Sequence, residues 1–205
     1  MMEFVTFGEI MLRLTPSQKG DKLLLAQEFA VGYAGAESNV AVSLSLLGNQ
    51  VSFISKVPNN PMGKAALFGL NQFGVSTDTV SLGGNRMGTY FIELGASIRP
   101  SRVVYDRQGS SISQIEPGEL DWDTILQNKN WLHLSGITPA LSDQCAKESI
   151  LAAETAKKYG VKVSFDLNFR RTLWPDGKTA RNIFDAIIAN SDVVFGNLGA
   201  LGDVY

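Results

Sequence analysis

The stretch at positions 161–171, VKVSFDLNFRR, decides the fold. Apolar residues alternate with smaller or polar ones over 161–165, which predicts a strand. The polar side chains that follow it are Asp166, Asn168, Arg170 and Arg171. Because ligands of an open parallel sheet bind at the carboxyl ends of its strands, these groups suit an anionic, hydroxyl-bearing small molecule. An alternative of equal weight is that Arg170 and Arg171 are solvated loop charges and that Asp166 caps a turn.

Strand and helix patterns alternate along the rest of the chain and predict a mostly parallel α/β sheet flanked by helices. The expected strands are 4–7, 50–57, 131–137, 161–167 and 192–195, and the expected helices are 36–47, 62–73, 142–159 and 179–189. Glycine or polar residues end four of these strands, at 8–9, 135–136, 166–170 and 196–197. Because the carboxyl ends of parallel strands meet at one edge of a sheet, this coincidence predicts a pocket there.

An antiparallel hairpin interrupts this alternation. Residues 89–94 and 102–107 read as two alternating strands around a turn. Period two places Tyr90 on one face of the first strand, and Tyr105 and Arg107 together on one face of the second. A flap or lid over a ligand is one interpretation, and an edge hairpin with structural tyrosines is the other.

Composition restricts the class of protein. The 205 residues are 44% hydrophobic and 19% charged, which is typical of a globular protein with a sizeable core. A net charge of −2 argues against nucleic acid or an anionic membrane surface as a partner. The single cysteine, Cys145, the absence of a signal peptide and the absence of a membrane-length apolar run lead us to expect a cytoplasmic protein.

Several kinds of catalytic site are excluded, and one ligand cradle is indicated. Gly35 opens a helical pattern whose free N–H groups can hold ligand oxygens, and Asn39 adds an amide; chain reversal alone is the alternative. The only histidine, His133, lies inside an apolar strand, so we expect a packed, hydrogen-bonded imidazole. The sequence has no histidine and cysteine cluster for zinc, no P-loop and no dinucleotide fingerprint.

Six motifs occur in an order that resembles the ribokinase-like (phosphofructokinase-B type) carbohydrate kinases, most closely the subgroup that acts on 2-keto-3-deoxygluconate. They are GEIMLRL (8–14), AGAESNVAVSLSLLG (34–48), VPNNPMG (57–63), VVYDR (103–107), HLSGITPALS (133–142) and VSFDLNFR (163–170). The similarity spans essentially all 205 residues. Two motifs depart from the broader family. VPNNPMG stands where V-G-x-D-x-x-G is usual, which suits the subgroup, and Ala200 stands where an acid is expected after Asn197.

The resemblance implies a ribokinase-like open sheet with an inserted antiparallel β lid, and an N-terminal substrate-binding portion at 1–205 with lid strands at about 11–35 and 87–107. It implies substrate contacts at Gly35, Ala36, Glu37, Ser38, Asn39, Tyr90, Tyr105, Asp106, Arg107 and Arg170. Asn168 and Asn197 would face the phosphates of ATP, which would carry Mg²⁺. The lid would pair with the lid of another subunit in a homo-oligomer.

The resemblance also implies the reaction. A sugar-acid kinase of this kind transfers the γ-phosphoryl group of ATP to 2-keto-3-deoxygluconate and gives the 6-phospho product. Its catalytic base is the aspartate of a G-A-G-D motif; the string GALGD at 199–203 has an extra residue and comes too early. We therefore expect the base and the nucleotide-binding half to lie beyond Tyr205, with no catalytic residue and no metal ligand in this chain. Another sugar or nucleoside kinase of this fold, or a non-catalytic sugar-acid-binding homologue, is the alternative.

Overall fold

A six-stranded parallel sheet forms the centre of the computed structural model, which describes residues 1–18 and 20–205. Its strands lie in the order β12 (Val193–Phe195), β11 (Lys162–Asp166), β10 (Trp131–Ser135), β1 (Glu3–Phe7), β4 (Gln50–Ile54) and β6 (Val75–Ser76). Each neighbouring pair is parallel. The prediction of a mostly parallel sheet is therefore confirmed.

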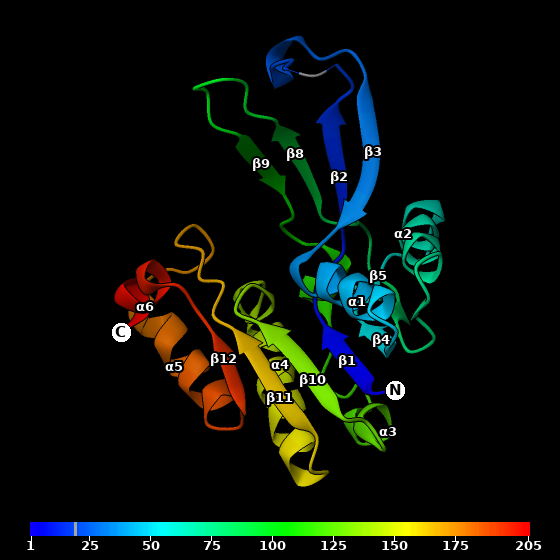
Figure 1. Cartoon of the computed structure of the whole chain (residues 1–205), viewed down its shortest axis with the longest axis vertical. Coiled ribbons are helices and arrows are strands. Elements are labelled where there is room, and N and C mark those ends of the chain that lie inside the picture. Colours follow the sequence, from blue (N-terminus) through cyan, green and yellow to red (C-terminus); the bar gives the residue numbers. More distant parts are fainter. Residues whose placement is uncertain (19) are drawn as a thin grey trace.

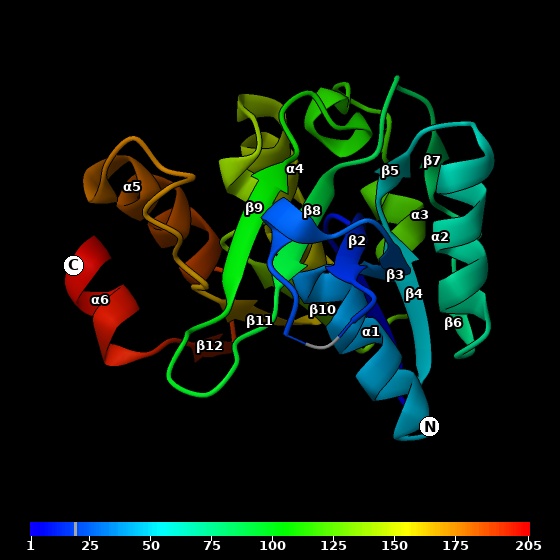
Figure 2. The same ribbon diagram turned by 90° about the horizontal axis from the view of Figure 1, so that it is seen from above.

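Helices cover both faces of this sheet (Figure 1). They are α1 (Ala36–Leu46), α2 (Pro61–Asn71), α3 (Trp122–Leu126), α4 (Asp143–Lys158), α5 (Gly177–Ile188) and α6 (Leu198–Val204), with short 3-10 turns η1 (Leu23–Leu25), η2 (Ser111–Gln114) and η3 (Thr138–Ala140). Seen from above, α4 and α1 lie on opposite sides of β10 (Figure 2). Two buried clusters hold these layers: one packs α3, α4 and α5 on the sheet, and the other packs α1 and α2.

Aromatic side chains anchor the larger cluster. Phe165 of β11 meets Phe184 of α5 edge to face, with ring centroids 5.2 Å apart, and Trp174 packs on the same Phe184 ring at 5.4 Å. This packing fixes the end of β11, so the polar residues after Phe165 leave a rigid strand.

A second sheet, here called the lid sheet, stands above the central sheet (Figure 1). It contains β3 (Phe29–Ala34), β2 (Met11–Pro16), β8 (Thr89–Glu93) and β9 (Arg102–Asp106) in that order. In the antiparallel β8–β9 hairpin Tyr90 is opposite Tyr105, so the two side chains lie on the same face of the hairpin. The structure thus has strands in both segments where lid strands were expected.

The main differences from the sequence prediction are at short elements. The single strand expected over 50–57 is divided, because β5 (Lys56–Val57) leaves the central sheet to pair with β7 (Ser81–Leu82). Helices α3 and α6 were not predicted. Helix α3 has only five residues, and the glycines of α6 obscure its pattern. None of the helices described within 1–18 and 20–205 has the length and apolar character needed to cross a membrane.

Candidate functional site

The carboxyl ends of β1, β10 and β11 face the lid sheet across a cavity of about 260 Å³. Its walls come from the strand ends, the first turn of α1 and the β8–β9 hairpin. The lining residues are Glu9, Met11, Ala34, Gly35, Ala36, Glu37, Asn39, Tyr90, Val103, Tyr105, Arg107, Ile137, Asn168 and Arg170. A pocket at this edge of the sheet was predicted from the strand ends alone.

Most of the site residues expected from the sequence line this cavity. They are Gly35, Ala36, Glu37, Asn39, Tyr90, Tyr105, Arg107, Asn168 and Arg170. Residues more than a hundred positions apart in the chain therefore meet in one place. Their individual roles toward a ligand remain predictions.

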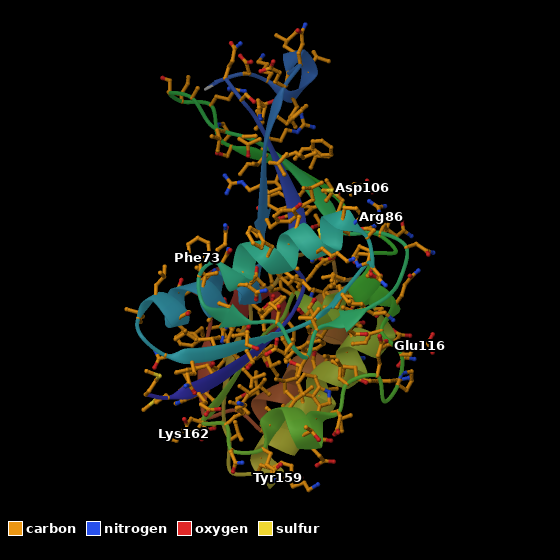
Figure 3. All side chains as sticks on the ribbon, turned by 90° about the vertical axis from the view of Figure 1, so that its right-hand side faces the viewer. Phe73, Arg86, Asp106, Glu116, Tyr159 and Lys162 are labelled. Carbon is orange, nitrogen blue, oxygen red and sulfur yellow. The ribbon has the colours of Figure 1, made fainter. Side chains whose placement is uncertain are left out.

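Three expected residues do not line it. Asp106 alternates to the other face of β9, where its carboxylate pairs with Arg86 at 2.7 Å; Figure 3 shows the two side by side at the base of the lid sheet. The Ser38 hydroxyl donates to the Gly35 carbonyl at 3.1 Å, inside the first turn of α1. The Asn197 side chain caps α6 by accepting from the Ala200 N–H at 2.8 Å.

Glu37 forms the floor of the cavity. Its side chain is buried, and its Oε1 accepts hydrogen bonds from the hydroxyls of Ser135 (2.6 Å) and Thr138 (2.7 Å). Burial raises the pKa of Glu37 to about 7, although these two hydrogen bonds and the charge of Arg107 favour the ionised form. The contacts fasten the first turn of α1, with the backbone of Gly35 and Ala36, to the end of β10.

The two arginines of the cavity have different surroundings. Arg107 forms an ion pair with Glu9, and both side chains are almost fully buried. Arg170 lies on the exposed side, and no carboxylate within 1–18 and 20–205 pairs with it. Arg170 therefore supplies a positive charge that the described part of the chain does not compensate.

The lid contributes an aromatic wall. The rings of Tyr90 and Tyr105 lie 5.9 Å apart with 36° between their planes, and the Arg107 guanidinium lies 5.5 Å from the Tyr105 ring centroid. Opposite this wall, Asn168 has a φ of 32°, and its N–H donates to Asp166 Oδ1 at 3.0 Å. This tight turn brings the chain after β11 to the cavity, so aromatic and polar groups converge on a small ligand.

Five lining residues were not expected from the sequence: Glu9, Met11, Ala34, Val103 and Ile137. For Glu9 a signal existed, because it lies two residues after β1, at one of the four strand ends from which the pocket was predicted. Val103 shares the period-two face of Tyr105. The apolar residues at positions 11, 34 and 137 carry no chemical signal that separates them from core residues.

The only histidine and the only cysteine of the chain are both buried. His133 is hydrogen-bonded through Nδ1 to the Ser164 hydroxyl at 2.9 Å, and burial lowers its pKa. Cys145 lies within α4, and burial raises the pKa of its thiol to about 12. The packed, hydrogen-bonded imidazole expected for His133 is thus confirmed. In residues 1–18 and 20–205, no three His, Cys, Asp or Glu side chains gather as a metal site.

Comparisons with known proteins identify a family of similar sequences. The family model described as "pfkB family carbohydrate kinase" matches residues 1–202. A 2-dehydro-3-deoxygalactonokinase of Haloferax volcanii is 37% identical over 94% of this chain and 59% of its own length. A 2-dehydro-3-deoxygluconokinase of Bacillus subtilis is 32% identical over 95% of this chain and 60% of its own.

A solved structure shares the fold. The crystal structure of 2-dehydro-3-deoxygluconokinase from Thermotoga maritima superposes with a TM-score of 0.96 and 44% identity, over 100% of this chain and 62% of that one. The fold that the resemblance implied is confirmed. The chain spans about three fifths of the length of these relatives.

Proposed function

Because the chain belongs to the pfkB family of carbohydrate kinases, we propose that it forms the substrate-binding part of an ATP-dependent kinase for 2-keto-3-deoxygluconate. This acid is also called 2-dehydro-3-deoxygluconate, the compound in the names of two similar proteins. The observation that carries the proposal is the uncompensated guanidinium of Arg170 in a cavity whose other arginine is already paired.

The chemistry of the cavity favours an acid over a neutral sugar. A carboxylate gains a charge-assisted hydrogen bond from a free arginine, which stabilises the complex by about 1.5–3 kcal/mol. A neutral sugar gains little from that charge. The hydroxyls and keto oxygen of the acid would contact the amide of Asn39, the backbone at Gly35 and the phenols of Tyr90 and Tyr105.

The role of these residues is to bind and orient. Transfer of a phosphoryl group depends mainly on positioning and on neutralising charge, and ATP with Mg²⁺ would supply the group and the metal charge. The described residues form no metal cluster, so we assign no metal ligand here. Asn168 and Asn197 are proposed to face the nucleotide, and a cytoplasmic location is part of the same proposal.

Calorimetric titration of the chain tests the substrate class. We expect 2-keto-3-deoxygluconate to bind more tightly than fructose, which is a neutral keto sugar of similar size. The C4 epimer, 2-keto-3-deoxygalactonate, serves as a second acid that shares the carboxylate. Equal affinity for fructose would favour another sugar kinase of this fold. No binding of either acid would overturn the proposal.

A further inference from the structure

Glu9 lies where the central sheet, the lid sheet and α1 meet. It lies two residues after the end of β1, it is only 3% exposed, and it lines the cavity. A Cβ added at Gly35 would overlap the Glu9 carbonyl oxygen, so the backbone of Glu9 packs tightly on the start of α1. The backbone of Glu9 is therefore fixed by its contact with Gly35.

The carboxylate of Glu9 contacts both ends of the β8–β9 hairpin. One oxygen, Oε2, accepts from Nη2 of Arg107, which follows β9. The other, Oε1, packs on Gly88, which precedes β8; a Cβ added there would lie 2.5 Å from it. Glu9 thus connects the central sheet to the two points at which the hairpin leaves and rejoins the chain.

These contacts fix the guanidinium of Arg107. Glu9 binds one edge of it, and the Tyr105 ring lies 5.5 Å from its central carbon. Neither Oε1 of Glu9 nor Nε of Arg107 has a hydrogen-bond partner among the described atoms, although both are buried. The pair is thus incompletely satisfied.

Stability alone does not account for such a pair. Transfer of two charges from water to the protein interior costs free energy. Replacement of a buried ion pair by well-packed apolar residues often leaves the stability of the fold unchanged or increases it. The pair lies in the wall of the cavity and carries unpartnered polar atoms, which points to a role in binding.

We propose that Glu9 is a positioning residue that holds the Arg107 guanidinium in one orientation toward the ligand. The inference rests on the proposed function, because it assumes that the ligand is a sugar acid. Arg107, with its charge offset by Glu9, donates hydrogen bonds of fixed direction, while Arg170 supplies the net charge. In this role Glu9 acts on the ligand through Arg107.

A double-mutant cycle tests the proposal through affinity for 2-keto-3-deoxygluconate. We expect Glu9→Gln to weaken binding roughly tenfold, since it loosens one charge-assisted donor. The Glu9→Gln/Arg107→Gln variant should bind no more weakly than Arg107→Gln alone, because Glu9 acts only through Arg107. If Arg107→Gln unfolds, since it leaves the Glu9 charge unpaired, Arg107→Lys replaces it in the cycle. Independent, multiplicative effects would overturn the proposal.

A matched control and a ligand-free measurement complete the test. Glu119→Gln removes the ion pair with Lys56 outside the cavity and should leave affinity unchanged. In NMR spectra, the Nε–Hε signal of Arg107 should be resolved in the wild type and averaged in Glu9→Gln. An equally immobile Arg107 in the variant would overturn the inference. If the wild type binds no sugar acid, the proposed function fails, while the NMR signal still decides whether Glu9 holds Arg107.

Discussion

Two neighbouring arginines at the end of β11 differ in their surroundings, and this difference isolates the charge of the cavity. Arg170 lines the cavity without a carboxylate partner among the described residues, whereas the exposed Arg171 pairs with Asp203 of α6. We expect Arg170→Ala to weaken binding of 2-keto-3-deoxygluconate by roughly 10- to 100-fold, the equivalent of one charge-assisted hydrogen bond. Titration calorimetry of the Arg170→Ala variant and of the wild type measures this loss of affinity.

Arg171→Ala is the matched control, because an exposed ion pair contributes little to stability. It should leave the affinity for the acid nearly unchanged. If the two variants lose the same affinity, or if fructose binding suffers as much as acid binding from the loss of Arg170, the assignment of the carboxylate to Arg170 is wrong.

Glu37 makes the stability of the fold depend on pH. Its pKa is about 7 in the folded chain, raised by burial from an ordinary 4.5. The folded state therefore binds the proton more tightly than the unfolded state, so this group's contribution is most favourable below pH 4.5. It is lost as the pH rises to about 7. A shift of this size corresponds to roughly 3 kcal/mol.

The Glu37→Gln variant removes the pH-dependent contribution of Glu37 to stability and so tests the prediction. We expect its free energy of unfolding to equal that of the wild type near pH 4.5 and to exceed it near pH 8. Urea denaturation across this range measures the difference. Glu154→Gln, at an exposed position of α4, is the control, and its free energy of unfolding should change with pH as that of the wild type does. A constant offset between Glu37→Gln and the wild type at every pH would contradict the prediction.

At the scale of elements, long periodic segments were predictable and short ones were not. Helix α4 spans 143–158 against an expected 142–159, because Ser142 caps it by accepting from the Cys145 N–H at 3.1 Å. The two-residue strand β5 exists only through its pairing with β7. Such a strand depends on a partner that its own sequence does not specify.

The candidate site follows the same division. Strand ends predict the edge of the sheet at which the pocket lies, and period two predicts that Tyr105 and Arg107 share a face. The resemblance to the kinase family then implies that Tyr90, Tyr105 and Arg170 contact the substrate. The hydrogen-bond or ion-pair partner of each side chain cannot be predicted in this way, because it depends on tertiary packing. Nothing in the local sequence shows that Arg107 is paired with Glu9, 98 positions away. Alternation places Asp106 on the face opposite to Arg107, but it does not show that Asp106 pairs with Arg86.

The lid sheet leaves apolar side chains uncovered. Val31 and Val104, which lie on the face of the lid sheet opposite to the cavity-lining Val103, are 63% and 42% exposed. Exposed apolar surface of this kind favours association. We expect a dimer through the lid in sedimentation equilibrium at micromolar concentration.

Two lysine substitutions locate that contact. Val104→Lys, on the lid face opposite to Val103, should weaken the dimer, because it buries a charge at the interface. Leu151→Lys, at a 44% exposed position of α4, is the control and should have no effect. A wild-type monomer under these conditions would contradict the prediction.

At the scale of the whole molecule, the two carboxylates that line the cavity already contact other side chains of the described chain. Glu9 is engaged by Arg107, and Glu37 accepts from Ser135 and Thr138. A general base must be free to accept the proton of the attacking hydroxyl in the transition state. Because one oxygen of each of these carboxylates already holds other side chains in place, we assign the base to neither of them.

We therefore expect the 205-residue chain to bind 2-keto-3-deoxygluconate without phosphorylating it. A coupled assay of ADP release, with saturating ATP and Mg²⁺, should show no turnover that depends on the acid. Calorimetry on the same sample establishes that the chain is folded and binds the acid, so a negative result is not a result of unfolding. ADP release that rises with acid concentration and is lost in Arg170→Ala would contradict the prediction, and would assign the base to a residue among these 205.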